Sequence, residues 1–242
     1  MAKPYVLGIN GSQRKNGNTG KLVQHALDII AGHEIETKRI DLKGMKIKGG
    51  CTGCWLCRYR EATCEIKDDL QGIFEEMLKA DGIILGAPVY WGFAPAKLRA
   101  VIERAGILSE GRISSEKPVI DLGDPALWPV TKKGPGLFDR KLGGAITDAR
   151  RDGVITTYGE LLLWFTINNF IVVSSSYWSC GIGTKRVPKL NSKGEPIKLK
   201  DGVNILFEHS RTILEEDKEG RETIEVFAEN VAWAVNKLRV GE

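Results

Sequence analysis

The stretch YVLGINGSQRKNGNTGKLVQHALDII, residues 5–30, decides the fold class of this chain. It begins with a short apolar strand at residues 5–9 and continues into a polar turn rich in glycine and asparagine at residues 10–20. The segment that follows places its apolar residues at the spacing of one helix face: Leu22, Val23, Ala26, Leu27 and Ile30. A strand, a glycine-rich loop and an amphipathic helix in this order predict the first unit of a parallel α/β sheet.

The same alternation continues along the chain. Further strands are expected at four stretches: residues 35–42, 83–86, 144–147 and 170–175. The first of these is polar enough to be an edge strand. Further helices are expected at residues 69–80, 96–108, 158–167 and 223–238. The pattern predicts one domain over residues 1–242, built on a doubly wound, five-stranded parallel sheet whose ligands bind beyond the carboxyl ends of the strands.

Two stretches fit this skeleton poorly and are interpreted as insertions, at about residues 109–142 and 184–222. The second contains a lysine-rich run over residues 185–200, which is either a solvated loop or a surface for docking ferredoxin. The closing helix is expected to pack one apolar face on the sheet, formed by Ile224, Phe227, Val231, Ala234 and Leu238.

Composition narrows the class of protein. The 242 residues are 42% apolar and 27% charged, as in ordinary globular proteins. The net charge of +4 is spread along the chain, which argues against a nucleic-acid partner. No apolar run approaches the roughly 18 residues that a membrane helix needs, and the N-terminus resembles no secretion signal. We therefore expect a cytoplasmic protein with no membrane partner.

The loop at residues 10–20 is suited to an anion, because it joins a strand to a helix N-terminus with unpaired backbone N–H groups. Ser12, Asn16, Asn18 and Thr19 add short donors, and Arg14 adds positive charge. The loop matches neither common nucleotide fingerprint. A phosphate site and a plain polar turn with a helix cap both remain open.

Four of the five cysteines, Cys51, Cys54, Cys57 and Cys64, form the motif C-x2-C-x2-C-x6-C within a loop at residues 49–66. Such spacing lets a turn direct successive thiolates at one centre, and four thiolates suit either zinc or a [4Fe-4S] cluster. Three cysteines at successive x2 intervals favour the cluster, since structural zinc usually takes two separated C-x2-C pairs. Zinc and free thiols remain as alternatives.

A loop stiffened by two prolines, APVYWGFAP at residues 87–95, follows the third expected strand. It places Tyr90 and Trp91 at the strand end, where a planar cofactor could lie against them. Aromatic residues in such places are otherwise core or rim residues.

In this order, these motifs resemble the iron–sulfur flavoproteins within the flavodoxin-like group of NAD(P)H-dependent FMN reductases. The matching segments are GSQRKNGNTG (11–20), the cysteine motif with IKDDL (66–70), APVYWGFAPAKLRAVIER (87–104) and, more loosely, TDARRDGVITT (147–157). The resemblance covers about residues 5–175.

The resemblance implies the cofactors and their ligands. Ser12, Arg14, Asn18 and Thr19 would hold the FMN phosphate, in a cofactor-binding loop that also includes Asn16 and Gly17. The isoalloxazine ring would be bordered by Pro88, Val89, Tyr90 and Trp91, with Ala149 and Arg150 also assigned to the cofactor. The four cysteines would hold a [4Fe-4S] cluster. No catalytic residue is identified.

The chain also departs from the family pattern. Asp148, Ala149, Arg151 and Asp152 replace glycines expected near the flavin, and these charges either read a polar substrate or lie in a solvated loop or subunit contact. Cys180 follows the fifth expected strand, where it either approaches the ligand crevice or serves as a buried structural thiol.

The expected activity is electron transfer from ferredoxin or a similar low-potential donor, through the cluster and FMN, to a small-molecule acceptor. The resemblance also implies a homodimer or homotetramer. One alternative is an NAD(P)H-dependent FMN or quinone reductase with a structural zinc. Another is a non-catalytic redox carrier or sensor.

Overall fold

The structure is a computed structural model that describes residues 3–14, 17–110, 136–183, 186–199, 205, 207–209 and 213–239. Its centre is a parallel sheet with the strand order β2-β1-β3-β4-β5. The strands are β1 (Tyr5–Asn10), β2 (Glu36–Asp41), β3 (Gly82–Pro88), β4 (Leu142–Ala149) and β5 (Ile171–Val172). The doubly wound sheet is confirmed, and the polar segment predicted as an edge strand is β2 at the edge.

The fifth strand differs from the prediction, which was a continuous strand over residues 170–175. Only β5 pairs with the start of β4, and a further strand, β6 (Cys180–Ile182), pairs with the end of β4. Between them, Ser175 Oγ donates a hydrogen bond to the Thr223 carbonyl at 2.5 Å, and Asn230 donates to the Ser174 carbonyl at 2.9 Å. The two serines therefore bond to the last helix instead of continuing the ladder.

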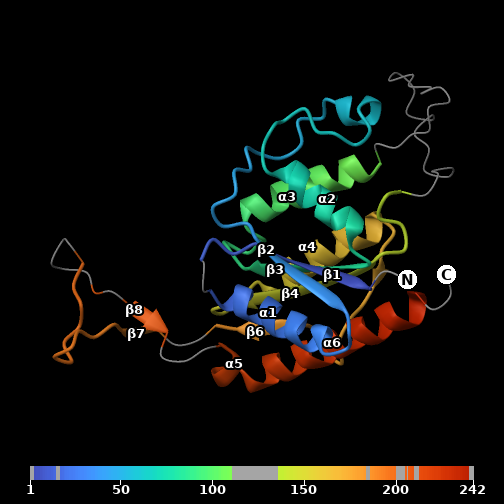
Figure 1. Ribbon diagram of the computed structural model, residues 1–242. Helices are drawn as coiled ribbons and strands as arrows, with labels where there is room; N and C mark the ends of the chain where they lie inside the picture. Colours follow the sequence, from blue (N-terminus) through green and yellow to red (C-terminus); the bar gives the residue numbers. More distant parts are fainter. Residues whose placement is uncertain are drawn as a thin grey trace.

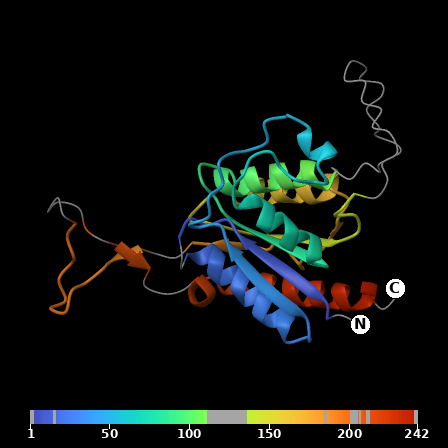
Figure 2. The same ribbon diagram turned by 45° about the horizontal axis from the view of Figure 1, so that its top comes forward.

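Helices cover both faces of the sheet (Figures 1 and 2). On one face lie α1 (Asn18–Ala31) and α6 (Lys218–Arg239), and on the other lie α2 (Leu70–Lys79), α3 (Ala96–Ser109) and α4 (Val154–Ile167). The core on the α2–α4 side contains an aromatic group packed largely edge to face: Phe74, Phe138, Trp164, Phe165 and Phe170. Each face of the sheet therefore has its own apolar core, as a doubly wound fold requires.

Several helix boundaries differ from those expected. The helix α4 begins at Val154 rather than 158, and α6 begins at Lys218 rather than 223. The expected apolar face of α6 is buried at Ile224, Phe227, Val231 and Ala234. Leu238 is 52% exposed, so its expected place on the sheet was wrong. It lies in the last turn of α6, which ends at Arg239.

The two predicted insertions are shorter than expected where the structure describes them. Leu142 belongs to β4 and Phe138 is fully buried, while residues 111–135 lie outside the described residues. The second insertion ends before α5 (Ile213–Glu216) and contains an antiparallel pair, β7 (Arg186–Pro188) and β8 (Phe207–His209). This pair projects away from the sheet in both views (Figures 1 and 2).

No helix in the part of the chain that the structure describes is both long and apolar enough to cross a bilayer. The organisation of residues 1–242 as one domain stays a prediction.

Candidate functional site

Three loops meet at the carboxyl ends of β1, β3 and β4. The first comprises residues 11–14 and 17, the second 89–94 and the third 150–153. The strand order makes the connections from β1 and β3 diverge, which opens the crevice where flavodoxin-like sheets bind ligands. We call these segments the three-loop site.

Short contacts hold these loops together. The Gly11 N–H donates to the Gly86 carbonyl at 2.8 Å, which joins the first loop to β3. The Val89 N–H donates to the Asp148 carbonyl at 2.9 Å, which joins β3 to β4. Gly153 has a φ of 91°, and a Cβ there would lie 2.8 Å from Val89 Cγ1, so the third loop approaches the second as only glycine permits. The sheet therefore brings together the loops that the sequence predicted to share a cofactor.

The first loop is folded around Ser12, whose side chain is buried. The Ser12 N–H donates to Asn10 Oδ1 at 3.1 Å, and the Arg14 N–H donates to Ser12 Oγ at 3.2 Å. Gly17 precedes α1, and among the described residues no side chain caps this helix. The N–H groups of the first helical turn are therefore available to an anion, which suits the loop to a phosphate.

The residues predicted to bind the phosphate differ in exposure and in their place in the fold. Arg14 is exposed and Asn18 begins α1, whereas Asn16 lies outside the described residues. Thr19 is buried, and its hydroxyl donates to Asp148 Oδ1 at 2.5 Å. The Thr19 hydroxyl is thus already engaged by a carboxyl group at the end of β4.

Asp148 does not lie in a solvated loop, one of the environments expected for it. It is the seventh residue of β4 and 7% exposed, so the expectation that it lies in a solvated loop was wrong. Burial raises the pKa of Asp148 to about 6, although the Thr19 hydrogen bond and the nearby charge of Arg14 oppose the rise. Its neighbour Ala149 is buried as well, while Arg150 is exposed at the start of the third loop.

The second loop carries its aromatic residues outward. Tyr90 and Phe93 exchange two backbone hydrogen bonds of 2.8 and 3.2 Å, which closes a tight turn. Trp91 at its tip has a φ of 54°, an unusual value for a bulky residue, and is fully exposed. Pro88 ends β3 in a buried position and Val89 is half-buried. The turn therefore presents an indole ring at the rim of the three-loop site.

The helix α4 fixes this turn from one side. The Ala94 N–H donates to Glu160 Oε2 at 3.0 Å, and Arg99 forms an ion pair with the same carboxylate at 2.8 Å. The Arg99 guanidinium also lies over the Phe93 ring, 5.5 Å from its centroid. The exposed end of the second loop is thus held by contacts to two helices.

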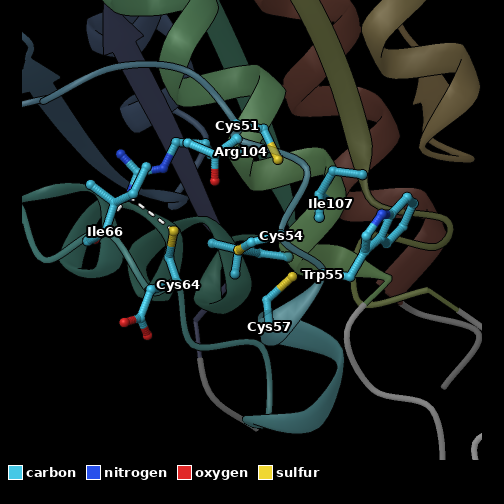
Figure 3. Close-up of a pocket in the computed structure, with 11 residues that line it drawn as sticks. Cys51, Cys54, Trp55, Cys57, Cys64, Ile66, Arg104 and Ile107 are labelled. Carbon is cyan, nitrogen blue, oxygen red and sulfur yellow. Dashed lines mark hydrogen bonds between the residues drawn. The ribbon is translucent and has the colours of Figure 1, made fainter.

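The cysteine loop, residues 49–66, lies on the α2 and α3 side of the sheet (Figure 1). Its one regular element is the short 3-10 helix η1 (Leu56–Tyr59). The backbone turns repeatedly through the left-handed region, at Gly53, Trp55, Glu61 and Ala62. Cys51, Cys54, Cys57 and Cys64 all line one pocket against α3, where Ile107 and Leu108 form part of its wall (Figure 3).

The thiols of this pocket differ in acidity. Hydrogen bonds from the Leu56 backbone and the Thr52 side chain lower the pKa of the exposed Cys54 thiol. Burial raises the pKa of the Cys57 thiol, and the neighbouring Cys51 and Cys54 thiolates raise it further by repulsion. Because thiolates close together repel one another, a cationic centre that binds all four would relieve this repulsion.

The donor set of this pocket fits an iron–sulfur cluster. In the described part of the chain, no three His, Cys, Asp or Glu side chains are gathered tightly enough to share one metal ion. A tetrahedral zinc site would need sulfurs about 3.8 Å apart, given Zn–S bonds of about 2.3 Å. In a cubane each of four cysteines binds a different iron, so four thiols around one pocket accord with the cluster.

Sequence reasoning missed two charged residues beside the cysteines, Arg104 and Asp68. Arg104 lies on the buried face of α3, three residues after Val101 and four before Leu108, and its side chain is 1% exposed. The sequence signal that could have identified this pair is an arginine at a position of the helix where the pattern expects an apolar residue. Cys180 lies apart from the other cysteines, with its sulfur 3.1 Å from Thr147 Oγ1.

Comparisons with known proteins agree with this geometry. Residues 4–185 match the NADPH-dependent FMN reductase family. An iron–sulfur flavoprotein of Methanocaldococcus jannaschii is 35% identical over 207 residues, which cover 83% of this chain and 92% of that protein.

Two solved structures show the fold. RosB with bound 8-demethyl-8-formylriboflavin-5'-phosphate has a TM-score of 0.62 at 14% identity, over 98% of this chain and 81% of that one. A flavodoxin, WrbA-like protein of Agrobacterium tumefaciens has a TM-score of 0.54 at 11% identity, over 98% of this chain and 99% of that one. At such identities the likeness concerns the fold alone.

The family match covers the three-loop site and the cysteine loop together. The similarity to the M. jannaschii protein extends over most of both chains. The chain therefore belongs to the NADPH-dependent FMN reductase family and, within it, to the iron–sulfur flavoproteins, flavin-dependent oxidoreductases whose cofactors are FMN and an iron–sulfur cluster.

Proposed function

We propose that the protein passes electrons from a low-potential donor such as ferredoxin to a small-molecule acceptor, with a [4Fe-4S] cluster at the cysteine pocket and FMN at the three-loop site. The observation that carries the proposal is the gathering of all four motif cysteines around one pocket, in a chain that also has the three-loop site. A cluster exchanges single electrons and FMN exchanges one or two, so together they link one-electron donors to two-electron acceptors.

At the three-loop site, the first loop would bind the FMN phosphate. Ser12 and the first-turn N–H groups of α1 supply neutral donors, and the exposed Arg14 supplies positive charge. The backbone contacts at Gly11 and Val89 fix the loops relative to the strands, so little ordering is needed when the cofactor binds. Tyr90 and Trp91 border the ring in this proposal.

At the cysteine pocket, the four thiolates would ligate the cluster. Cys54 is exposed and its pKa is lowered, which favours the thiolate form that binds iron. Ile107 and Leu108 present apolar surface behind the sulfurs and exclude water from that side. Restricted solvent access of this kind is one of the factors that set the potential of a cluster.

We further propose a homodimer or homotetramer, in which the cysteine pocket of one subunit lies near the three-loop site of another. Support comes from the exposure of the group at each site that would have to meet its counterpart: Cys54 is exposed, and Trp91 is fully exposed. Light scattering coupled to gel filtration would test this assembly, and a monomer at micromolar concentration would contradict it.

A second candidate is direct reduction of FMN by NADPH, with zinc at the cysteines. The description of the matching family favours NADPH as a donor. The acceptor in either case is a small molecule such as a quinone, a nitro compound or an oxygen species. We place this chemistry in the cytoplasm, where thiols remain reduced.

The metal and flavin content of the purified protein distinguishes the two candidate functions. The full chain is purified anaerobically, and iron, acid-labile sulfide, zinc and FMN are assayed on one sample. About four irons and four sulfides per FMN are expected for a cubane with four cysteine ligands. Zinc in place of iron would establish the second candidate, and a chain without flavin would overturn both.

A further inference from the structure

A buried ion pair lies directly behind the cysteine pocket. The side chain of Arg104 is 1% exposed and that of Asp68 is 0% exposed. The guanidinium donates to both carboxylate oxygens, at 2.7 Å to Oδ2 and 3.1 Å to Oδ1. This bidentate geometry fixes the plane of the guanidinium.

The two terminal nitrogens of Arg104 that bind Asp68 also reach the cysteine loop. One terminal nitrogen lies 3.1 Å from Cys64 Sγ, the contact drawn as a dashed line in Figure 3, and 3.0 Å from the Ile66 carbonyl. The other lies 3.4 Å from the Gly49 carbonyl. One side chain on α3 therefore joins the two ends of the cysteine loop and donates to one of its sulfurs.

Asp68 is itself held in place. It accepts hydrogen bonds from the Lys48 N–H at 2.9 Å and the Leu70 N–H at 3.2 Å, besides those from Arg104. An arginine guanidinium stays charged in a folded protein, and its two bonds to Asp68 fix its orientation. The guanidinium thus keeps its charge and its direction toward the sulfur.

Burying two charges is costly, and well-packed apolar residues of similar size often stabilise a fold as well or better. The presence of a buried ion pair beside the cysteine pocket therefore points to a role of its charge beyond packing. Hydrogen bonds to the sulfurs and the local net charge are two of the factors that set the potential of an iron–sulfur cluster.

We propose that Arg104 is a positioning residue of the cluster site, which raises the reduction potential by donating an N–H to Cys64 Sγ while Asp68 orients the guanidinium and offsets part of its charge. The inference rests on the proposed function, because it requires a cluster at this pocket. Reduction adds one electron, supplied by the low-potential donor, and no bond to the protein forms or breaks. The added negative charge favours a nearby cation and N–H donor.

The test is a redox titration of the anaerobically reconstituted full chain, followed by electron paramagnetic resonance. Arg104→Gln removes the cation and, because the glutamine side chain is shorter, withdraws the N–H donor from Cys64 Sγ. We therefore expect the equilibrium constant for reduction to fall about tenfold, which lowers the potential by about 59 mV for one electron. Asp68→Asn leaves the charge of Arg104 without its counterion, so the potential shifts upward. The double variant has no unpaired charge, and its potential falls by less than that of Arg104→Gln.

Opposite shifts in the two single variants distinguish this role from simple loosening of the loop. Lys79→Gln, which removes an exposed cation at the end of α2, serves as the control and leaves the potential unchanged. Shifts in the same direction, or unchanged potentials in variants that keep their iron and sulfide, would overturn the role of Arg104. If a single variant fails to fold, the double variant decides: a fall in its potential supports the role of Arg104, and an unchanged potential overturns it. Wild-type chain without iron or sulfide would overturn the proposed function itself.

Discussion

The three-loop site and the cysteine loop are built in different ways. The loops of the first start at the ends of buried parallel strands, and backbone hydrogen bonds such as Gly11 to Gly86 connect them. The only regular secondary structure in the cysteine loop, residues 49–66, is η1. The side chains of Arg104 and Asp68 hold this loop against α3. The topology of the sheet thus forms one site, while side-chain interactions form the other. The two sites should therefore respond separately to mutation.

The variant Cys54→Ala is expected to affect the two sites most differently. Cys54 is exposed and belongs to the loop alone, so its removal should abolish the cluster while FMN stays bound at the three-loop site. Iron, sulfide and FMN assays measure both contents, and Cys180→Ala is the matched control that should keep both cofactors. Simultaneous loss of FMN and iron from a folded Cys54→Ala chain would show that the two sites are not separate.

The second-largest effect is expected when one partner of the buried ion pair between Arg104 and Asp68 is removed. Asp68→Ala leaves Arg104 charged and unpaired, which should lower the free energy of unfolding by about 3–5 kcal/mol. Hydrogen exchange should rise in residues 49–66 and stay unchanged in residues 11–14. The control Glu222→Ala, which removes an exposed partner of Lys218, should change stability by less than about 1 kcal/mol. Equal losses in both variants would contradict a special role for the buried pair.

The three-loop site has its own sensitive group in Asp148. Its pKa is about 6 in the folded chain, above the ordinary 3.8, so the folded state holds this proton more tightly than the unfolded state. The resulting stabilisation is fully present below about pH 4 and is lost as the pH rises through 6, about 3 kcal/mol in all.

The variant Asp148→Asn isolates this effect, because it is neutral at every pH and can still accept from Thr19. Urea unfolding at pH 4, 5, 6 and 7 should show wild type losing about 2 kcal/mol of this stabilisation relative to the variant. Parallel stability curves for the two proteins would refute the raised pKa.

The smallest effect is expected at the tip of the second loop. Trp91 is fully exposed at a φ of 54°, so Trp91→Asn relieves backbone strain without removing buried surface. Stability should rise by about 1 kcal/mol, since asparagine tolerates the left-handed region. FMN affinity, followed by fluorescence quenching, should fall severalfold if the indole borders the ring. No change in either quantity would exclude both expectations.

Much of the fold could be predicted because its signals are local. Residues 5–30 carry a strand, a turn and a helix period within one stretch, and β1 and α1 formed there. The interruption between β5 and β6 could not be predicted in this way. It depends on two hydrogen bonds with α6: the Ser174 carbonyl accepts from Asn230, 56 residues further along the chain, and the Ser175 hydroxyl donates to the Thr223 carbonyl, 48 residues further along.

The candidate site likewise has features that local sequence predicts and features that depend on tertiary packing. Spacing alone identified the cysteines, which the structure gathers in one pocket. The pairing of Arg104 with Asp68 spans 36 residues, and that of Thr19 with Asp148 spans 129. Such pairs arise only when strands and helices pack, so their burial and pKa values follow from tertiary structure and not from any local pattern.

The most direct test of electron entry through the cysteine pocket is anaerobic stopped-flow reduction of the bound flavin. Reduced ferredoxin is mixed with wild type and with Cys54→Ala reloaded with FMN, and flavin absorbance is followed. We predict that wild type is reduced at least about tenfold faster, because the variant lacks the one-electron entry site. Equal rates in the two proteins would contradict entry through the cysteine pocket.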